Sequence, residues 1–189
     1  MWFKRSPEMD CIHHYMSPLG GITLASDGEA LTGLWFDGQK HFEETLSMEH
    51  AEGDLPVFAQ AEKWLDVYFS GRQPDFIPLL HIKASIFRAT VWETLLAIPY
   101  GKTVTYREIA ARTAKRIGLC RTSARAVGGA VGCNPIALII PCHRVVGADG
   151  SLTGYAGGID RKLRLLQLEQ ADLSDLYEEA SGTIRMRKK

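Results

Sequence analysis

A cysteine, a histidine and an arginine follow one another at residues 142–144, directly after a proline that ends the apolar run Ala137–Ile140. Such a run is typical of a buried strand, so the three groups are expected where a buried segment ends. Neighbouring imidazole and guanidinium groups can favour the thiolate, which is the nucleophilic form of cysteine. A cysteine buried as a small hydrophobe fits the same pattern. The pattern alone therefore leaves both a nucleophile and a core cysteine open.

The other three cysteines, at positions 11, 120 and 133, are expected to be unreactive free thiols. No two cysteines form a Cys-x-x-Cys pair, which excludes a zinc ribbon and a thioredoxin-type motif. A metal site built from Cys133, Cys142 and His143 is disfavoured because their spacing does not suit a compact ligand set. Any thiol chemistry therefore rests on Cys142.

The net charge is zero, but it is divided along the chain. Residues 1–100 carry seven basic and fourteen acidic side chains, whereas residues 101–170 carry eleven basic and four acidic ones. A basic segment of this size is expected where a polyanion docks. A solvated basic face, or one that pairs with the acidic half, would explain it equally well.

The amino-terminal half has the pattern of a mixed α/β domain. Residues 18–36 indicate short strands separated by glycine turns, and residues 56–69 have helical apolar spacing. A linker over Gly71–Pro78 places the domain boundary at about residue 82. No apolar run approaches the length of a membrane span, and Met1–Asp10 lacks a secretory signal, so we expect a cytoplasmic protein.

The second half is expected to form helices around a loop. The apolar stripe Phe87–Leu96 is stopped by Pro99, and the capping box Thr105–Glu108 predicts a helix over Tyr106–Arg116. A second helix over residues 124–131 completes the outline of a helix-turn-helix.

This second helix contains two interior glycines, Gly128 and Gly129, each of which costs about 1 kcal/mol relative to alanine. Either a partner approaches the helix closely from outside, or the helix packs tightly against another one. Arg125 is its one long side chain and is a candidate probe into a groove.

The sequence Ile140–Val145 (IPCHRV) closely resembles the active-site motif of the O6-alkylguanine-DNA alkyltransferases. Arg125–Gly128 resembles the start of the recognition helix of that family, and Asn134-Pro135 stands eight residues before the cysteine, as in the family. Residues 154–158 resemble the loop that closes over a flipped base, and Arg161–Glu169 resembles the final helix. Several motifs in the same order make this resemblance specific.

The resemblance implies an α+β fold. Residues 1–82 would form a small mixed α/β domain of the ribonuclease H-like type, including the linker. Residues 83–170 would form the DNA-binding alkyltransferase domain, which is helical with a helix-turn-helix of winged-helix type. Residues 171–189 would form a carboxyl-terminal tail. The detailed resemblance covers about residues 85–170.

The implied activity is DNA repair by irreversible, single-turnover alkyl transfer to Cys142. The donors would be O6-alkylguanine and O4-alkylthymine in double-stranded DNA, with the damaged base flipped out of the duplex. The helix-turn-helix would enter the minor groove, and the protein would act as a monomer without a cofactor or a metal.

The resemblance assigns catalytic roles to five residues. Cys142 would accept the alkyl group, and His143 would act as its base through a water that Glu169 orients. Asn134 would brace the thiol loop. Tyr106 would donate a hydrogen bond to the guanine leaving group and help to rotate the phosphate.

Further residues would bind DNA or the substrate. Arg125 would fill the gap left by the flipped nucleotide, and the other implied DNA contacts are Thr105, Ala126 and Gly128. The implied substrate contacts are Val145, Tyr155 and Ala156.

One departure and two other classes of function remain open. The stretch Ala114–Thr122 is about five residues longer than the shortest connection in the family. A non-catalytic DNA-binding protein, such as a helix-turn-helix regulator or a lesion-flagging relative, would share the helices, although the lesion-flagging relatives lack the reactive cysteine. A cysteine hydrolase would also use a cysteine–histidine pair, but it would turn over.

Overall fold

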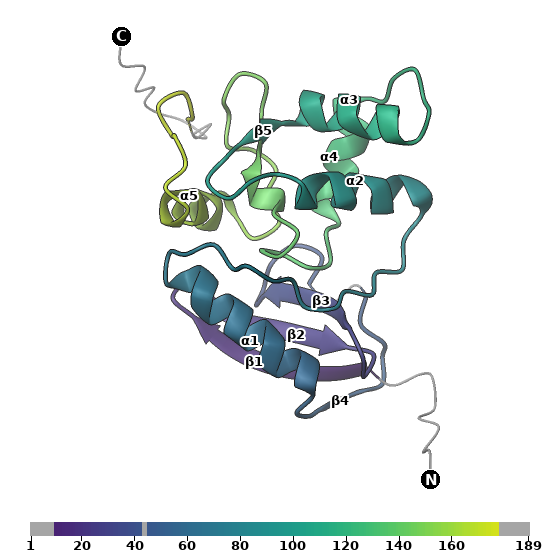
Figure 1. Cartoon of the computed structure of the whole chain (residues 1–189), viewed down its shortest axis with the longest axis vertical. Coiled ribbons are helices and arrows are strands. Elements are labelled where there is room, and N and C mark those ends of the chain that lie inside the picture. Colours follow the sequence, from purple (N-terminus) through teal and green to yellow (C-terminus); the bar gives the residue numbers. More distant parts are fainter. Residues whose placement is uncertain (1–9, 43–44, 178–189) are drawn as a thin grey trace. The chain divides into compact units, whose positions relative to one another are not determined.

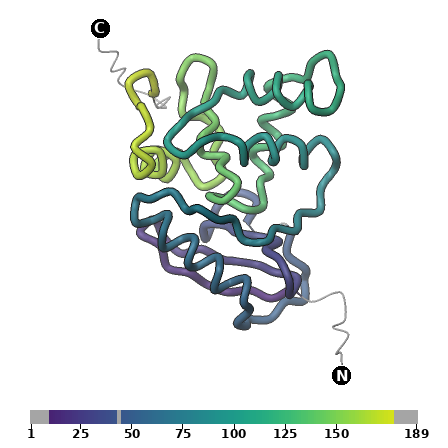
Figure 2. Tube along the Cα trace, viewed as in Figure 1, coloured from purple at the N-terminus to yellow at the C-terminus, as the bar shows by residue number. Residues whose placement is uncertain are grey.

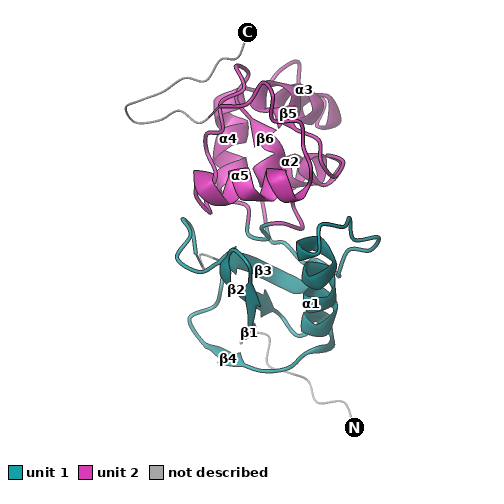
Figure 3. Ribbon diagram, turned by 90° about the vertical axis from the view of Figure 1, so that its left-hand side faces the viewer, with its two compact units in different colours: residues 1–83, 135–137 teal, residues 84–134, 138–189 magenta. Residues whose placement is uncertain are grey.

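The computed structural model describes residues 10–42 and 45–177, which form two compact units (Figure 3). Unit 1 runs to residue 83 and also includes Pro135–Ala137, and unit 2 holds the remainder of the described chain. A mixed α/β amino-terminal part and a helical carboxyl-terminal part confirm the expected fold class. Of the predicted tail, residues 178–189 lie outside the described residues. No described helix is long and apolar enough to cross a membrane.

Unit 1 is a four-stranded sheet with one helix lying along it (Figure 1). The strands follow the spatial order β3-β2-β1-β4, in which β1, β2 and β3 are antiparallel and β4 runs parallel to β1. The elements are β1 (Asp10–Ser17), β2 (Gly20–Ser26), β3 (Leu31–Phe36), β4 (His50–Glu52) and α1 (Pro56–Phe69).

The helix α1 has the bounds that its apolar spacing predicts. Pro56 begins it, at a position where the missing N–H would have no partner within the helix. The buried face includes Phe58, Trp64 and Tyr68, and the ring of Phe58 stacks on His13 of β1 with centroids 5.4 Å apart. The aromatic side chains thus hold α1 against the sheet.

The outer edge of β3 pairs with a segment from much later in the chain. The backbone N–H of Leu34 donates to the carbonyl of Pro135, and its carbonyl accepts from Ala137, both at 2.8 Å. The strand expected over Ala137–Ile140 does not form, because the chain turns at Leu138, whose φ is +67°. The prediction was wrong about the conformation of this run, although its side chains are buried.

Unit 2 packs three helices together and adds a fourth beside the cysteine-bearing turn. Trp92 of α2 donates its indole N–H to the carbonyl of Ala130 in α4 at 2.8 Å, which ties those helices. Figure 2 traces the connection from α3 to α4 as a loop beyond the end of α3. The elements are α2 (Ile86–Leu96), β5 (Val104–Thr105), α3 (Tyr106–Arg116), α4 (Ala124–Gly132), the 3₁₀ turn η1 (Cys142–Arg144), β6 (Val145–Val146) and α5 (Ile159–Leu168).

Local capping fixes where α3 and α4 begin. The hydroxyl of Thr105 accepts from the N–H of Glu108 at 3.2 Å, and the Glu108 carboxylate accepts from the N–H of Thr105 at 2.9 Å. This confirms the predicted capping box. Ser123 caps α4 by accepting from the N–H of Ala126 at 3.0 Å. The two helices of the predicted helix-turn-helix are therefore defined by their own sequence.

Candidate active site

Cys142 begins η1 and is buried, with 5% of its surface exposed. The side-chain amide of Asn134 donates to Cys142 Sγ at 3.1 Å and to the carbonyl of Ile140 at 2.8 Å. Burial raises the pKa of the Cys142 thiol, while the Asn134 hydrogen bond and the charge of Lys162 act in the opposite direction. The thiol is therefore protonated at neutral pH, and a base must take its proton before it can attack.

The imidazole of His143 lies next to that thiol in sequence and is fully buried. Its Nε2 is 2.7 Å from Glu169 Oε1. Burial lowers the pKa of His143, and the Glu169 carboxylate opposes this effect without overcoming it. The ring is thus neutral at neutral pH and able to accept a proton. Because Glu169 contacts the ring directly, it orients the imidazole itself, and the expected role of Glu169 in orienting a water stays a prediction.

Arg144 is bound to the same carboxylate. Its Nε donates to Glu169 Oε2 at 2.8 Å, its Nη2 donates to Oε1 at 3.0 Å, and its Nη1 donates to the carbonyl of Ile98 at 2.7 Å. Burial raises the pKa of Glu169, but the hydrogen bonds and charges of His143 and Arg144 outweigh it and hold that pKa far below its usual value. Arg144 therefore holds the Glu169 carboxylate in place.

Lys162 of α5 is a charged residue of this site that sequence reasoning missed. It is fully buried, and its Nζ donates to the carbonyls of Val145 at 2.6 Å and Thr153 at 2.8 Å. Burial lowers the pKa of Lys162 to about 8, so the side chain is still largely charged at neutral pH. Its positive charge opposes the effect of burial on the Cys142 thiol. The available signal was its spacing from Leu165 and Leu166, which puts a lysine on the apolar face of α5.

Tyr106 begins α3 and reaches the loop at residues 153–154. Its hydroxyl donates to the carbonyls of Thr153 and Gly154, each at a long 3.3 Å. Burial, and then the charge on Cys142, raise the pKa of Tyr106 to about 12, so it stays a neutral donor. Gly154 has a φ of +73°, and a Cβ placed there would be 2.6 Å from the Tyr106 hydroxyl. This contact requires glycine at position 154.

The remaining residues expected to bind substrate surround the same turn. Tyr155 is buried, its ring centroid is 6.4 Å from that of His143, and its hydroxyl has no hydrogen-bond partner among the described residues. Ala156 follows and is half-buried. Val145 is fully buried, and its carbonyl already accepts from Lys162. The structure thus places Tyr155 beside His143, and Val145 directly after the thiol turn.

A surface hollow of roughly 480 Å³ lies on the side of α4 that carries Arg125. Tyr106, Arg125 and Gly128 line it together with the loop residues Thr153 and Gly154. The structure therefore gathers three of the predicted DNA and catalytic residues at one opening.

The other two predicted DNA contacts lie outside the lining of this hollow. Thr105 caps α3 and is half-buried, and Ala126 is exposed on α4. Both lie directly next to lining residues along the chain.

Packing inside the protein does not account for the glycines of α4. A Cβ at Gly128 would approach Tyr106 only to 3.9 Å, which is ordinary contact, and a Cβ at Gly129 would meet nothing within 4 Å. Of the two readings of these glycines, tight packing of helices is therefore disfavoured, and close approach of an outside partner is favoured.

Comparisons with known proteins cover both units. Residues 86–171 match the model of the 6-O-methylguanine DNA methyltransferase, DNA binding domain, and residues 12–80 match that of its ribonuclease-like domain. The methylated-DNA–protein-cysteine methyltransferase of Mycobacterium tuberculosis strain H37Rv is 46% identical over 157 residues, which is 82% of this chain and 89% of that protein. The protein of that name from Haemophilus influenzae is 39% identical over 164 residues, 86% of this chain and 87% of that protein.

Solved structures give the same result. The crystal structure of the M. tuberculosis O6-methylguanine methyltransferase has a TM-score of 0.72 and 44% identity, and the match covers 86% of this chain and 93% of that one. The M. tuberculosis protein crystallised in complex with DNA has a TM-score of 0.72 and 43% identity over 86% of this chain and 92% of that one. The chain belongs to the 6-O-methylguanine DNA methyltransferase family, whose curated members are named methylated-DNA–protein-cysteine methyltransferases.

Proposed function

We propose that this protein repairs double-stranded DNA by moving the alkyl group of O6-alkylguanine, or of O4-alkylthymine, onto Cys142, and that it acts as a monomer. One observation carries the proposal above all. The buried Cys142 thiol, held by Asn134, directly precedes a neutral imidazole that the Glu169 carboxylate orients. The names of the relatives, and the relative crystallised with DNA, support the same activity.

The transfer is a displacement at a saturated carbon. His143 takes the thiol proton through a bridging water, and the resulting imidazolium is stabilised by Glu169 at 2.7 Å. The Cys142 sulfur then bonds to the alkyl carbon while the bond from that carbon to O6 breaks and its electron pair passes to the purine. Tyr106, a neutral donor, hydrogen-bonds the base as this charge develops.

The substrate base has to leave the helical stack before the sulfur can reach it, at a cost of a few kcal/mol. We assign Arg125, exposed beside the hollow, to filling the gap that the base leaves. Gly128 lets the DNA approach α4 closely, and Thr105 and Ala126 contact the adjacent backbone. The Tyr106 hydroxyl can exchange its long bonds to the loop carbonyls for a bond to the extruded nucleotide.

Four residues, Cys142, Val145, Tyr155 and Ala156, hold the extruded base. The backbone N–H of Ala156 donates to O6, and the carbonyls of Cys142 and Val145 accept from the guanine amino group. A carbonyl oxygen has two lone pairs, so Val145 can accept from Lys162 and from the base at the same time. The Tyr155 ring, which lies edge-on to His143, covers the extruded base.

A stoichiometric titration tests the proposal. The product is a thioether, which lacks a carbonyl for water to attack, so each molecule is expected to remove one alkyl group and then stop. Increasing amounts of protein are incubated with duplex DNA that contains O6-methylguanine, and the repaired fraction is measured at the endpoint. Cys142→Ala is the control, and it should bind DNA and repair nothing.

The other classes of function give different endpoints. Several groups removed per molecule, without an added reductant or cofactor, would identify a turning-over cysteine enzyme and would refute the proposal. Binding without any repair by the wild type would indicate a lesion-flagging protein.

A further inference from the structure

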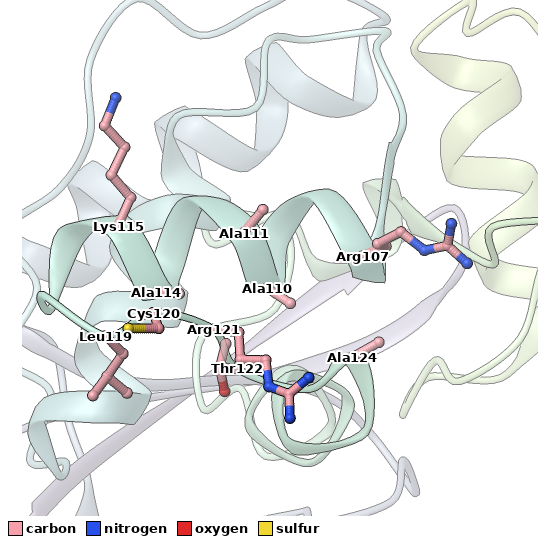
Figure 4. A pocket seen from close by; sticks show the side chains of 10 residues that line it. All are labelled: Arg107, Ala110, Ala111, Ala114, Lys115, Leu119, Cys120, Arg121, Thr122 and Ala124. Carbon is pink, nitrogen blue, oxygen red and sulfur yellow. The ribbon is translucent and has the colours of Figure 1, made fainter.

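A second hollow, of roughly 460 Å³, opens between α3 and the connection that leads to α4 (Figure 4). Most of the residues that line it are small or apolar. Three of the lining side chains, those of Arg107, Lys115 and Arg121, are basic, and none of the lining side chains is acidic. Arg107 and Ala124 line both this hollow and the one beside Arg125. The basic hollow is therefore the direct neighbour of the hollow beside Arg125, where we propose that the DNA approaches α4.

The arginines of unit 2 differ in what they contact. Arg144 is bound to Glu169, Arg116 to Glu93 at 2.7 Å and Arg164 to Asp160 at 3.1 Å. Within residues 10–42 and 45–177, Arg107 and Arg121 take part in no ion pair. The basic residues without an acidic partner in the described chain thus include those that line the hollow, and the charge there is available to an anion from outside.

The position of Arg121 is set by turns on both sides of it. On one side α3 ends at Gly118, whose φ is +72°, and the N–H of Leu119 donates to the carbonyl of Ala114 at 2.9 Å. This is the helix-ending bond of a Schellman motif. On the other side Ser123 caps α4. Only a few residues lie between these two fixed points, so the backbone that carries Arg121 is held in place.

The side chains around the hollow do not all face the same way. Figure 4 shows Arg121 extending from the connection toward Ala124, whereas Lys115 points away from the other lining side chains. Arg121 is therefore the basic side chain that Figure 4 shows extending toward α4, and Lys115 is not.

We infer that the hollow between α3 and α4 binds a backbone phosphate of the DNA strand next to the extruded nucleotide, with Arg121 as its principal contact and Arg107 beside it. The inference rests on the proposed function. Arg121 lies in the connection between α3 and α4, so this connection would extend the DNA-binding surface beyond α4.

Arg121→Ala tests this contact, with Arg116→Ala as its matched control. Both residues lie near the end of α3 and both changes remove one positive charge, but Arg116 is paired with Glu93 and does not line the hollow. Affinity for a short alkylated duplex is measured as a function of salt in the Cys142→Ala background. Loss of one phosphate contact should make the slope of log affinity against log salt about 0.9 less negative and weaken binding roughly three- to tenfold near 0.1 M salt.

The conservative variant Arg121→Lys should recover most of that affinity, because a lysine also supplies a point charge to a phosphate. Arg116→Ala should keep the wild-type slope. If Arg121→Ala and Arg116→Ala have the same slope and affinity, the inference is overturned.

The exposed Cys120 provides a second readout, because it lines the same hollow. Its alkylation by iodoacetamide should slow when the duplex is bound, and this protection should weaken in Arg121→Ala. An unchanged rate of alkylation, in a protein that still binds the duplex and repairs it through Cys142, would overturn the inference and leave the proposed function standing. Absence of repair by the wild type would instead refute the proposed function, and with it the inference.

Discussion

The ionic cluster behind the cysteine consists of His143, Arg144 and Glu169, all of which are buried. Removing charges from water is costly, and such clusters persist only when every partner is bound. Here the Glu169 carboxylate accepts from both of the other side chains and from the N–H of Gly101 at 3.0 Å. The cluster fixes one orientation of the imidazole, which is the property that a base next to a buried thiol needs.

Replacing this carboxylate should therefore destabilise the fold. Glu169→Gln leaves Arg144 buried without its counter-charge, and we expect a loss of about 3–5 kcal/mol in the free energy of unfolding at neutral pH. The measurement is urea denaturation, with Glu93→Gln as the control. Glu93 forms an exposed pair with Arg116, so its replacement should cost about 0–1 kcal/mol.

The difference in stability between the wild type and Glu169→Gln should also depend on pH. The pKa of Glu169 is lower in the folded protein than the 4.5 of a free glutamate, so this group stabilises the fold above pH 4.5 and the contribution is lost as the pH falls below that value. Wild-type stability should decline through this acid range more steeply than that of Glu169→Gln. Equal stability of the two proteins at neutral pH would contradict this account of the cluster.

The sequence was a good guide to some residues of the site and a poor guide to others. The sequence could point to Cys142 and His143 because they are adjacent in one motif, although the groups that surround them come from distant parts of the chain. The burial of Lys162 could not be predicted. A lysine on an apolar helix face can be recognised as a buried group only when the carbonyls that bind it are known. The pairing of Arg144 with Glu169 could not be predicted either, because the two residues are 25 apart in the sequence.

Among the elements, those defined by local signals could be predicted. The bounds of α1 and α3 follow from apolar spacing, a proline at the first turn and a capping box. The strands β1 and β4 could not be predicted. β1 contains His13 and His14 instead of an apolar run, and β4 is three exposed residues that exist only through pairing with β1.

The conformation of Ala137–Ile140 shows the same limit. An apolar run indicates burial in any conformation, and here tertiary pairing stops after Ala137 and the chain turns at Leu138. The sequence therefore indicated the burial of this segment and not its shape.

The element that enters DNA in our proposal is α4, and Arg125 tests its role. Arg125→Ala should reduce repair of duplex DNA more than reaction with the free alkylated base, since only the duplex leaves a gap to be filled. Both second-order rates are measured, and their ratio reports on base extrusion. Arg164→Ala serves as the control, because Arg164 is exposed on α5 and paired with Asp160. An equal loss on both substrates would argue against a role in flipping.

At the scale of the whole molecule, the fold class was predictable because strand and helix signals are separated along the chain. The roles expected for residues 83–170, as the alkyltransferase domain, and for residues 1–82, as its partner, stay predictions. The surprise is that Pro135–Ala137 belongs to unit 1 while Asn134 and Cys142 belong to unit 2. The chain thus leaves unit 2 and returns between two residues that are hydrogen-bonded at the site, an exchange that no local pattern could reveal.

The central claim is that the alkyl carbon becomes permanently bonded to the Cys142 sulfur. Mass spectrometry of peptides, after incubation with a duplex containing O6-methylguanine, tests it most directly. The account predicts one added CH₂ unit per molecule, on the peptide that contains Cys142, which persists on prolonged incubation. Demethylated DNA together with an unmodified Cys142, or with the methyl group on another cysteine, would contradict it.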